Sequence, residues 1–422
     1  MTTLTDPPKE SFRLSMLIYD TRYRSLTIQV IAMIGFMVLI GWLISNTAQN
    51  LQALGKEPSF RFLSEPAGYD INQRLIEYDS QATHLRAAFV GILNTLLVAV
   101  LGCITATILG VIIGVLRLSK NWLISRLMTI YVEMFRNVPL LLWIVFIMAI
   151  LIETLPAPRA FRGETPEATM NLADSVAITN RGVYVPEPLF SNSLGNIHLF
   201  GEHSLRFDIS LDLIAVLAAL FIGLFIRRKI KTRADAIQES TGDRPTTWYL
   251  SLGAVVIPTG AVLIALGFHL GYPELKGFNF KGGIHMRNSL IALWLALSLY
   301  TAAFIAEIVR AGILAISKGQ TEAASALGLR PNRTMSLVIL PQALRVIIPP
   351  LISNYLNLTK NSSLAIAVGY MDLTGTLMGV TLNQTGRELE TVLMGMSIYL
   401  AISLLISMVM NWYNNSVKLV ER

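Results

Sequence analysis

The sequence predicts an all-α membrane protein, a polytopic bundle of about eight transmembrane helices. Hydrophobic residues make up 53% of its 422 residues and charged residues only 14%, whereas about a quarter of a typical soluble domain is charged. The mean hydropathy is +0.55. The net charge of +7 comes from Lys and Arg that cluster between apolar runs, a distribution that orients a chain in a membrane. The composition therefore indicates contact with membrane lipid and argues against nucleic acid as a partner.

Eight apolar runs are candidate membrane spans because each approaches or exceeds the length that crosses a bilayer. If both ends of the chain are cytoplasmic, the basic loops all fall on the cytoplasmic side, as the positive-inside rule requires. The first run also resembles a signal peptide, but it is longer than a usual signal core and lacks a clean cleavage site, so we expect an uncleaved span. The runs lie at about residues 27–45, 86–116, 127–152, 210–226, 248–270, 287–313, from 336 onward, and 391–412.

The segments at 46–84 and 153–209 are polar and mixed in charge, so we expect both to be external. The first is expected to hold a short surface helix around Asp70–Ser80, and the second some local strands. A third, glycine-rich external loop follows the fifth span.

Two spans carry special residues. Gly110 and Gly114 have the small-xxx-small spacing of a close helix contact, although general packing of small residues accounts for it equally well. Pro349 and Pro350 lie in the seventh span and predict a kink or break, because proline lacks the N–H that a helix needs.

The sequence excludes several kinds of chemistry. Cys103 is the single cysteine, and the five histidines show no paired metal-binding spacing. No GxxxxGK[ST] phosphate-binding loop occurs; Gly55-Lys56 is followed by Glu57. We therefore expect no catalytic residue, no metal site and no cofactor in this chain.

A polar, small-residue island interrupts the apolar pattern at residues 306–344. Ser317 and Gln320 have the spacing of a capping box, and helix-forming residues follow them. Gly328 suits the left-handed position just past a helix end, and Pro331 prevents continuation. The island therefore predicts a capped helix of two to three turns, which is too short to span a bilayer and has a smooth, alanine-rich face.

The island resembles the EAA loop of ABC importer permeases, because Glu322-Ala-Ala, Gly328 and Val338-Ile-Leu-Pro341 have that loop's spacing. The flanking sequence is similar to the polar amino-acid type of these permeases. Val338 replaces the usual Ile, and Ser317 stands where many relatives have Pro. Similar segments lie at residues 135–141, 306–312, 318–320 and 358–365.

The resemblance implies a set of partners. They are a second permease subunit, expected to be a different chain, two cytoplasmic ABC ATPases that bind ATP and Mg, and a periplasmic solute-binding protein. The short helix would dock on the ATPase. Its small residues matter because bulk there would hold the two proteins apart, and Glu322 favours the positive end of the helix. The expected coupling residues are Lys318, Gly319, Gln320, Glu322, Ala323, Ala324 and Gly328.

Small permeases of this type have about five core spans, so this chain is larger than its family pattern and resembles the large-permease subgroup. We expect residues 1–85 to form the N-terminus, an added span and an external segment. Residues 86–152 would be the first part of the core, and 153–286 an insertion with two spans. Residues 287–422 would complete the core.

Polar residues inside spans are costly and often functional. Arg136 and Asn137 could hold a substrate carboxylate, or Arg136 could extend to the membrane surface. Glu307 could face the path or simply pair with Arg310 three residues later. The polar run after the two prolines could line the path or cap a helix end. The candidate path residues are Arg136, Asn137, Glu307, Thr359, Lys360, Asn361 and Ser362.

The function that the resemblance implies is a permease subunit of an ATP-driven importer of polar L-amino acids in a bacterial inner membrane. We expect a broad range that includes Glu, Asp, Gln and Asn. The alternative is a secondary transporter driven by an ion gradient, which predicts facing carboxylates in mid-membrane and an internal repeat. A membrane-bound enzyme would need a metal or nucleophile cluster. The sequence contains none of these features.

Overall fold

The computed structural model describes residues 15–55, 58–163, 165–199 and 207–417. The chain divides into two compact units, residues 1–60 and 61–422. The first unit holds α1 (Met16–Tyr19) and α2 (Thr21–Ala53), whose apolar side chains are exposed along its length, as expected of a membrane span. Both ends of the chain, which we expect to be cytoplasmic, lie outside the described residues.

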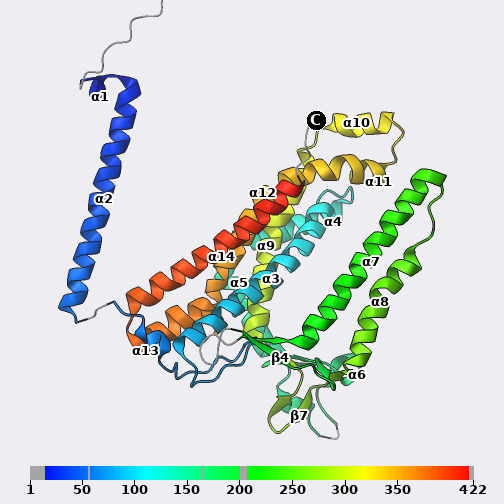
Figure 1. Ribbon diagram of the computed structural model, residues 1–422, viewed down its shortest axis with the longest axis horizontal. Helices are drawn as coiled ribbons and strands as arrows, with labels where there is room; N and C mark the ends of the chain where they lie inside the picture. Colours follow the sequence, from blue (N-terminus) through cyan, green and yellow to red (C-terminus); the bar gives the residue numbers. More distant parts are fainter. Residues whose placement is uncertain (1–14, 56–57, 164, 200–206, 418–422) are drawn as a thin grey trace, which may run out of the picture. The chain divides into compact units, whose positions relative to one another are not determined.

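The second unit is built around two adjacent helices, α3 (His84–Leu116) and α9 (Asn288–Leu314) (Figure 1). α5 (Leu140–Thr154) and α12 (Leu340–Asn361) pack against α9, and the largest apolar core lies among these four helices. We call the end where α3 and α9 begin the strap end, and the opposite end the α10 end.

Gly110 and Gly114 let α3 approach α9 closely, which confirms the contact that their spacing predicts. A Cβ atom on Gly110 would lie 2.6 Å from the Cβ of Ile305. On Gly114 it would lie 2.7 Å from the carbonyl oxygen of Ala306. No real Cβ atom tolerates such distances, so a side chain at either position would push the two central helices apart.

We therefore expect Gly114→Ala to destabilise the chain by about 1–3 kcal/mol, the usual cost of overpacking a core. The measurement is thermal unfolding of the purified chain in detergent. Gly260→Ala, inside the apolar helix α8 (Trp248–Ala265) of the same unit, is the matched control, because within the described residues nothing lies within 4 Å of its added Cβ. Equal stability of the two variants would contradict close packing of α3 on α9.

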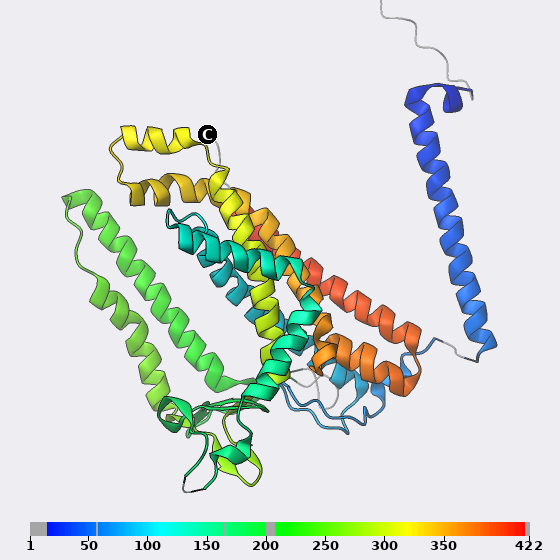
Figure 2. The same cartoon turned by 180° about the vertical axis from the view of Figure 1, so that it is seen from behind.

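The predicted third span is in fact two helices, α4 (Trp122–Asn137) and α5, and Figure 2 shows the chain turning between them. Val138 is extended, with φ −101° and ψ 133°, and Pro139 follows it as the N-cap of α5. Proline disfavours helical backbone in the residue before it. The expectation of a single span at 127–152 was therefore wrong, because Pro139 ends one helix and begins another.

Residues 61–83, which we call the strap, close the strap end of the bundle. The strap contains η1 (Arg61–Ser64), and no helix forms at Asp70–Ser80, so that prediction was wrong. The strap is an ordered coil that bonds partly to itself, since the N–H groups of Ala67 and Gly68 donate to the carbonyl oxygens of Ala82 and Ser80. Buried Asn94 of α3 ties it to the core, because its Nδ2 donates to the carbonyl oxygens of Gln73, at 2.7 Å, and Met371, at 2.8 Å. These bonds satisfy backbone groups that a helix would otherwise have paired.

The inserted residues between α5 and α9 contain η2 (Pro158–Phe161), α6 (Asn171–Asp174) and short antiparallel strands. The prediction of strands before the fourth span is confirmed. The glycine-rich segment after the fifth span is also mostly strand. The strands are β1 (Ala177–Thr179), β2 (Gly182–Val185), β3 (Glu187–Phe190), β4 (Asn196–Leu199), β5 (Phe207–Ser210), β6 (Phe268–Gly271), β7 (Glu274–Lys276), β8 (Asn279–Lys281) and β9 (Ile284–Arg287). They pair in the orders β1-β2-β9, β3-β6, β4-β5 and β7-β8.

Two long helices of the insertion, α7 (Leu211–Thr241) and α8 (Trp248–Ala265), form a hairpin. The basic run at Arg227–Arg233, which directly follows the predicted fourth span, continues α7 as helix. In the described part of the chain, seven helices are long and apolar enough to cross a membrane. α7 is the predicted span outside this group, because its apolar part ends where the basic run begins.

The remaining elements lie after α9. Pro349 and Pro350 do not break α12, which continues through both to Asn361, so the predicted break is absent. Both prolines are exposed, so their rings project away from the core. The elements are α10 (Lys318–Ala326), α11 (Pro331–Thr334), the π-helical turn η3 (Met335–Ile339), the 3₁₀ turn η4 (Ser362–Val368), the π-helical η5 (Thr374–Thr381), α13 (Leu382–Thr385) and α14 (Glu388–Val417).

Candidate functional site

The polar island forms the short helix that its sequence predicts, α10, at the end of the second unit opposite the strands (Figure 1). Ser317 is its N-cap, but the predicted capping box is wrong, because the Ser317 side chain makes no cap hydrogen bond. The side chain of Gln320 instead accepts a hydrogen bond from Nε2 of Gln342 at 3.3 Å. Gln320 therefore ties α10 to α12 rather than to its own first turn.

The end of α10 confirms the role predicted for Gly328, whose φ is +75°. The Gly328 N–H donates to the carbonyl oxygen of Ser325, and the Leu329 N–H to that of Ala324. These two bonds form a Schellman motif, which needs a left-handed residue at this position. Gly328 thus acts on the shape of the helix end and keeps it free of a side chain.

α10 has one face on its own chain and one face free. Ala324 is 3% exposed and belongs to the face that packs on η3, so in this structure it supports α10 instead of offering a contact to a partner. Gly319, Glu322 and Ala323 are exposed and share a face by their i, i+3, i+4 spacing. Lys318 and Gln320 are exposed at the start of the helix.

Two exposed residues of this helix were missed by sequence reasoning. Ala326 extends the smooth face by one turn, and its signal was the i+7 spacing from Gly319. Leu327 is 81% exposed, and a large apolar side chain inside a polar island was the signal that could have found it.

Glu307 lies between two arginines, not in open space. One carboxylate oxygen accepts from Nη2 of Arg310 at 2.5 Å, and the other contacts Nη1 of Arg117, the C-cap residue of α3. The side chain of Arg117 is 9% exposed and that of Glu307 28%. The carboxylate therefore bridges α3 and α9, which favours pairing over a place in the path.

Arg136 and Asn137 are both exposed at the last turn of α4, next to the break before α5. The Arg136 guanidinium lies over the ring of Phe304, 5.4 Å from its centroid. Phe304 is ten residues before the end of α9, about 15 Å along the helix axis. Asn137 donates to the Glu133 carboxylate at 3.2 Å. The exposed Arg136 therefore lies beside the middle turns of α9, on the outer side of this helix.

The polar run at the end of α12 divides into two pairs. Thr359 and Ser362 are buried, and their hydroxyls donate to backbone oxygens of Tyr355 and Thr359 at 2.9 and 2.8 Å. Lys360 is exposed, and Asn361 is partly buried. The structure brings the first two into helix packing and leaves the second two accessible.

Lys360 continues a polar stripe that sequence reasoning also missed. Ser353 and Asn357 are exposed on the same face of α12, at i−7 and i−3 from Lys360. A helical wheel drawn from Pro349 onward could have found this stripe. Polar side chains in a membrane helix face protein or water rather than lipid.

Comparisons with known proteins identify the family of this chain. The family described as binding-protein-dependent transport system inner membrane component matches residues 106–419. A glutamate/glutamine/aspartate/asparagine transport system permease protein, BztB of Rhodobacter capsulatus, is 60% identical over the full length of both chains. The general L-amino acid transport system permease protein AapQ of Rhizobium johnstonii is 43% identical over 98% of this chain and 96% of its own.

A third relative is a putative amino-acid ABC transporter permease protein, YhdX of Escherichia coli K12, which is 43% identical over 94% of this chain and 95% of its own. Among solved structures, one described as an amino acid ABC transporter with histidines covers 78% of this chain and 94% of its own, at a TM-score of 0.42 and 18% identity. Together with the apolar helices, the family match identifies a multi-pass inner-membrane permease. The chain belongs to the family of inner membrane components of binding-protein-dependent transport systems.

Proposed function

We propose that this chain is one of two permease subunits of an ATP-driven ABC importer for polar L-amino acids, and that separate subunits hydrolyse the ATP. A periplasmic solute-binding protein would deliver the amino acid at the strap end. The second permease would be a different chain. Both ends of this chain and α10 would lie in the cytoplasm, where the ATPases dock.

The observation that carries the proposal is α10. Its free face presents Gly319, Glu322 and Ala323 at one end of the bundle, and its other face is held by Ala324 and Gln320. A short helix with one smooth free face suits a groove on another protein, where close approach needs small side chains.

The chain between α10 and the polar stripe can carry a displacement. α11, η3 and α12 follow one another without an intervening loop from Pro331 to Asn361. α12 alone has 22 residues, about 33 Å of helix. When the ATPases close, a rigid-body shift of α10 would therefore move the stripe that includes Asn357 and Lys360.

The proposed substrate path lies along that stripe and the α4–α5 break. Backbone that leaves a helix within a membrane is tolerated where it lines protein or water, and Arg136 stands at this break. Its guanidinium can hold a carboxylate through two parallel hydrogen bonds. We extend the substrate classes printed for the relatives, namely glutamate, glutamine, aspartate and asparagine or general L-amino acids, to this chain as part of the proposal.

The test is purification of the full-length chain from its own membrane, followed by reconstitution of the co-purifying complex in liposomes. We expect an ABC ATPase to co-purify, and we expect uptake of labelled glutamate, aspartate, glutamine and asparagine to require ATP and the solute-binding protein. Uptake that needs only an ion gradient would replace the proposal with a secondary transporter.

Arg136→Ala should lower uptake by about tenfold or more, since it removes a charge-assisted hydrogen bond pair to substrate. Arg126→Ala is the matched control, because Arg126 is an exposed arginine on the same helix. The measurement is initial uptake rate in liposomes with equal amounts of assembled complex. Unchanged uptake in Arg136→Ala would make Arg136 a surface anchor instead of a substrate ligand.

A further inference from the structure

A cavity of about 460 Å³ lies at the strap end, where three parts of the chain meet. The strap contributes Asn72 and Gln73, the insertion contributes residues of β9 and of the β1–β2 turn, and the core contributes the start of α9 and the η4–η5 connection. We call it the amide pocket and define it by Asn72, Asn180, Arg181, His285, Arg287 and Asn288.

The charged side chains of the described residues that line the amide pocket are all positive. Two of its lining residues, Arg181 and Arg287, are arginines, and none of the lining residues in the described part of the chain is Asp or Glu. Burial and the nearby Arg287 hold the pKa of His285 below its usual value, so this ring is neutral at pH 7. The pocket therefore offers two fixed positive charges without internal neutralisation.

Several polar atoms of the pocket are buried without a partner in the described chain. Asn288 is 3% exposed, and its Nδ2 donates to the carbonyl oxygen of Asn180 at 2.7 Å, while its Oδ1 has no partner. Oδ1 of Asn180 and Nε of Arg287 are likewise buried and unpaired. Buried polar atoms normally find partners because leaving them unpaired costs the free energy of their lost hydration. Two acceptors and one guanidinium donor thus remain for a ligand.

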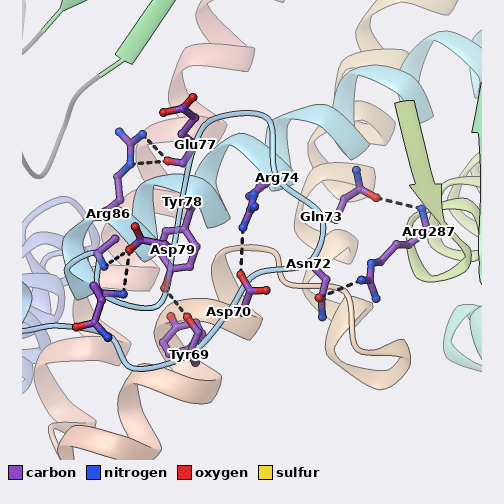
Figure 3. A network of polar contacts seen from close by, with 12 residues as sticks. Tyr69, Asp70, Asn72, Gln73, Arg74, Glu77, Tyr78, Asp79, Arg86 and Arg287 are labelled. Carbon is purple, nitrogen blue, oxygen red and sulfur yellow. Dashed lines mark hydrogen bonds and ion pairs between the residues drawn. The ribbon is translucent and has the colours of Figure 1, made fainter. Parts of the chain in front are cut away.

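The arginines are held in place by neighbours rather than by carboxylates. Figure 3 shows Nη2 of Arg287 donating to Oδ1 of Asn72 at 3.0 Å, and its backbone N–H donating to Oε1 of Gln73 at 3.1 Å. Arg181 donates through Nη1 to the carbonyl oxygen of Phe278 at 3.3 Å. Amide and carbonyl partners orient a guanidinium but leave its charge free for an anion.

We propose that the amide pocket binds a free L-α-amino acid outside the membrane path, and that it favours one with a second carboxylate. The two guanidinium groups suit carboxylates, and the unpaired oxygens of Asn180 and Asn288 suit the α-ammonium group. Its role as a receiving site before the membrane path rests on the proposed function. The pocket also suggests a function for the insertion at residues 153–286, because Asn180, Arg181 and His285 of the insertion line the pocket.

The experiment measures binding of tritiated L-glutamate to the purified full-length chain in lipid nanodiscs. All variants are made in an Arg136→Ala background, so that the proposed path site does not contribute. We expect saturable binding there and about tenfold or more weakening on Arg181→Gln or Arg287→Gln. L-glutamine, and glutarate without its amine, should compete less well than L-glutamate.

Two further variants keep the result interpretable. Arg74→Gln is the matched control, an arginine of the strap paired with Asp70 and outside the pocket (Figure 3), and it should bind like the parent. Asn288→Leu keeps a similar size but removes the acceptor that would meet the α-ammonium group, so it should also weaken binding. Arg181 is exposed, so Arg181→Gln should leave the fold intact. Thermal unfolding of the variant checks this.

Binding that is absent from the parent, or that is unaffected by both arginine substitutions, would overturn the proposal. Neither result depends on an ATPase. Failure of the proposed function would appear instead as uptake without ATP, in the separate liposome assay, so the two failures are distinguishable.

Discussion

Replacing Ala323 with tryptophan is expected to abolish co-purification of the ATPase and ATP-dependent uptake, while the chain itself still folds. Ala323 is exposed on the free face of α10, so a large side chain meets no neighbour in this chain. On a docked helix the same ring would hold the two proteins apart. The measurements are the ATPase content of affinity-purified complex and the initial uptake rate of labelled glutamate.

Thr321→Trp is the control on the same helix. Thr321 is exposed too, but it lies about 160° around the helix from Ala323 and has no i, i+3 or i+4 spacing to the three residues of the smooth face. Ala324→Trp would be uninformative, because Ala324 is buried against its own chain. Normal ATPase recovery with Ala323→Trp, or equal loss with both tryptophan variants, would argue against docking through the Gly319–Glu322–Ala323 face.

Replacing Glu307 with alanine is expected to lower the stability of the chain strongly. The carboxylate contacts Arg117 and Arg310, and its removal leaves two positive charges facing each other inside the bundle. Breaking a fully buried pair costs about 3–5 kcal/mol, and the partial exposure of Glu307 reduces that cost here. Thermal unfolding of the purified chain, followed by size-exclusion chromatography, measures the loss.

A double substitution separates the pairing role from a substrate role. Arg117→Met together with Glu307→Ala should recover part of the stability, because it removes the unpaired charge and keeps apolar bulk. If Glu307→Ala instead left thermal unfolding unchanged and raised only the KM for uptake, Glu307 would belong to the substrate path after all.

The parts of the fold that the sequence predicts well are those set by local chemistry. Gly328 ends α10 in the expected left-handed conformation, since few other residues adopt it. The apolar runs became helices because a chain in lipid must satisfy its backbone within each helix. Gly110 and Gly114 marked the α3–α9 contact through their lack of side chains.

Two of the failed structural predictions involve hydrogen bonds between residues far apart in the sequence, and a third, at Pro139, does not. The strap is an ordered coil that pairs with itself across about fifteen residues, as at Ala67 and Ala82, and with Asn94 of α3. Gln320 paired with Gln342 from α12 and not with the start of its own helix. At Pro139 the amphipathic α4, which carries Glu133 and Arg136, gives way to the apolar α5, so the change of pattern was present in the sequence and was overlooked.

The candidate path residues show the same limit. Thr359 and Lys360 are adjacent and both polar, yet Thr359 is buried with its hydroxyl bonded to the backbone of its own helix, while Lys360 is exposed. Only the orientation of α12 against its neighbours separates them. The sequence predicts which segment of α12 is polar, whereas packing determines which of its side chains remain accessible.

The pairing of β2 with β9 has a consequence for how this long permease could be rebuilt. Gly182 lies opposite Arg287, and Val185 opposite Ile284, so the polypeptide leaves this ladder and returns to it at neighbouring points. The residues between them, including the α7–α8 hairpin, leave and rejoin the core at this one ladder. A short turn joining Val185 to Ile284 would excise about a hundred residues without stretching the chain that enters α9, and it would remove the ring contacts of Phe207 with Phe89 and of Phe280 with Tyr184.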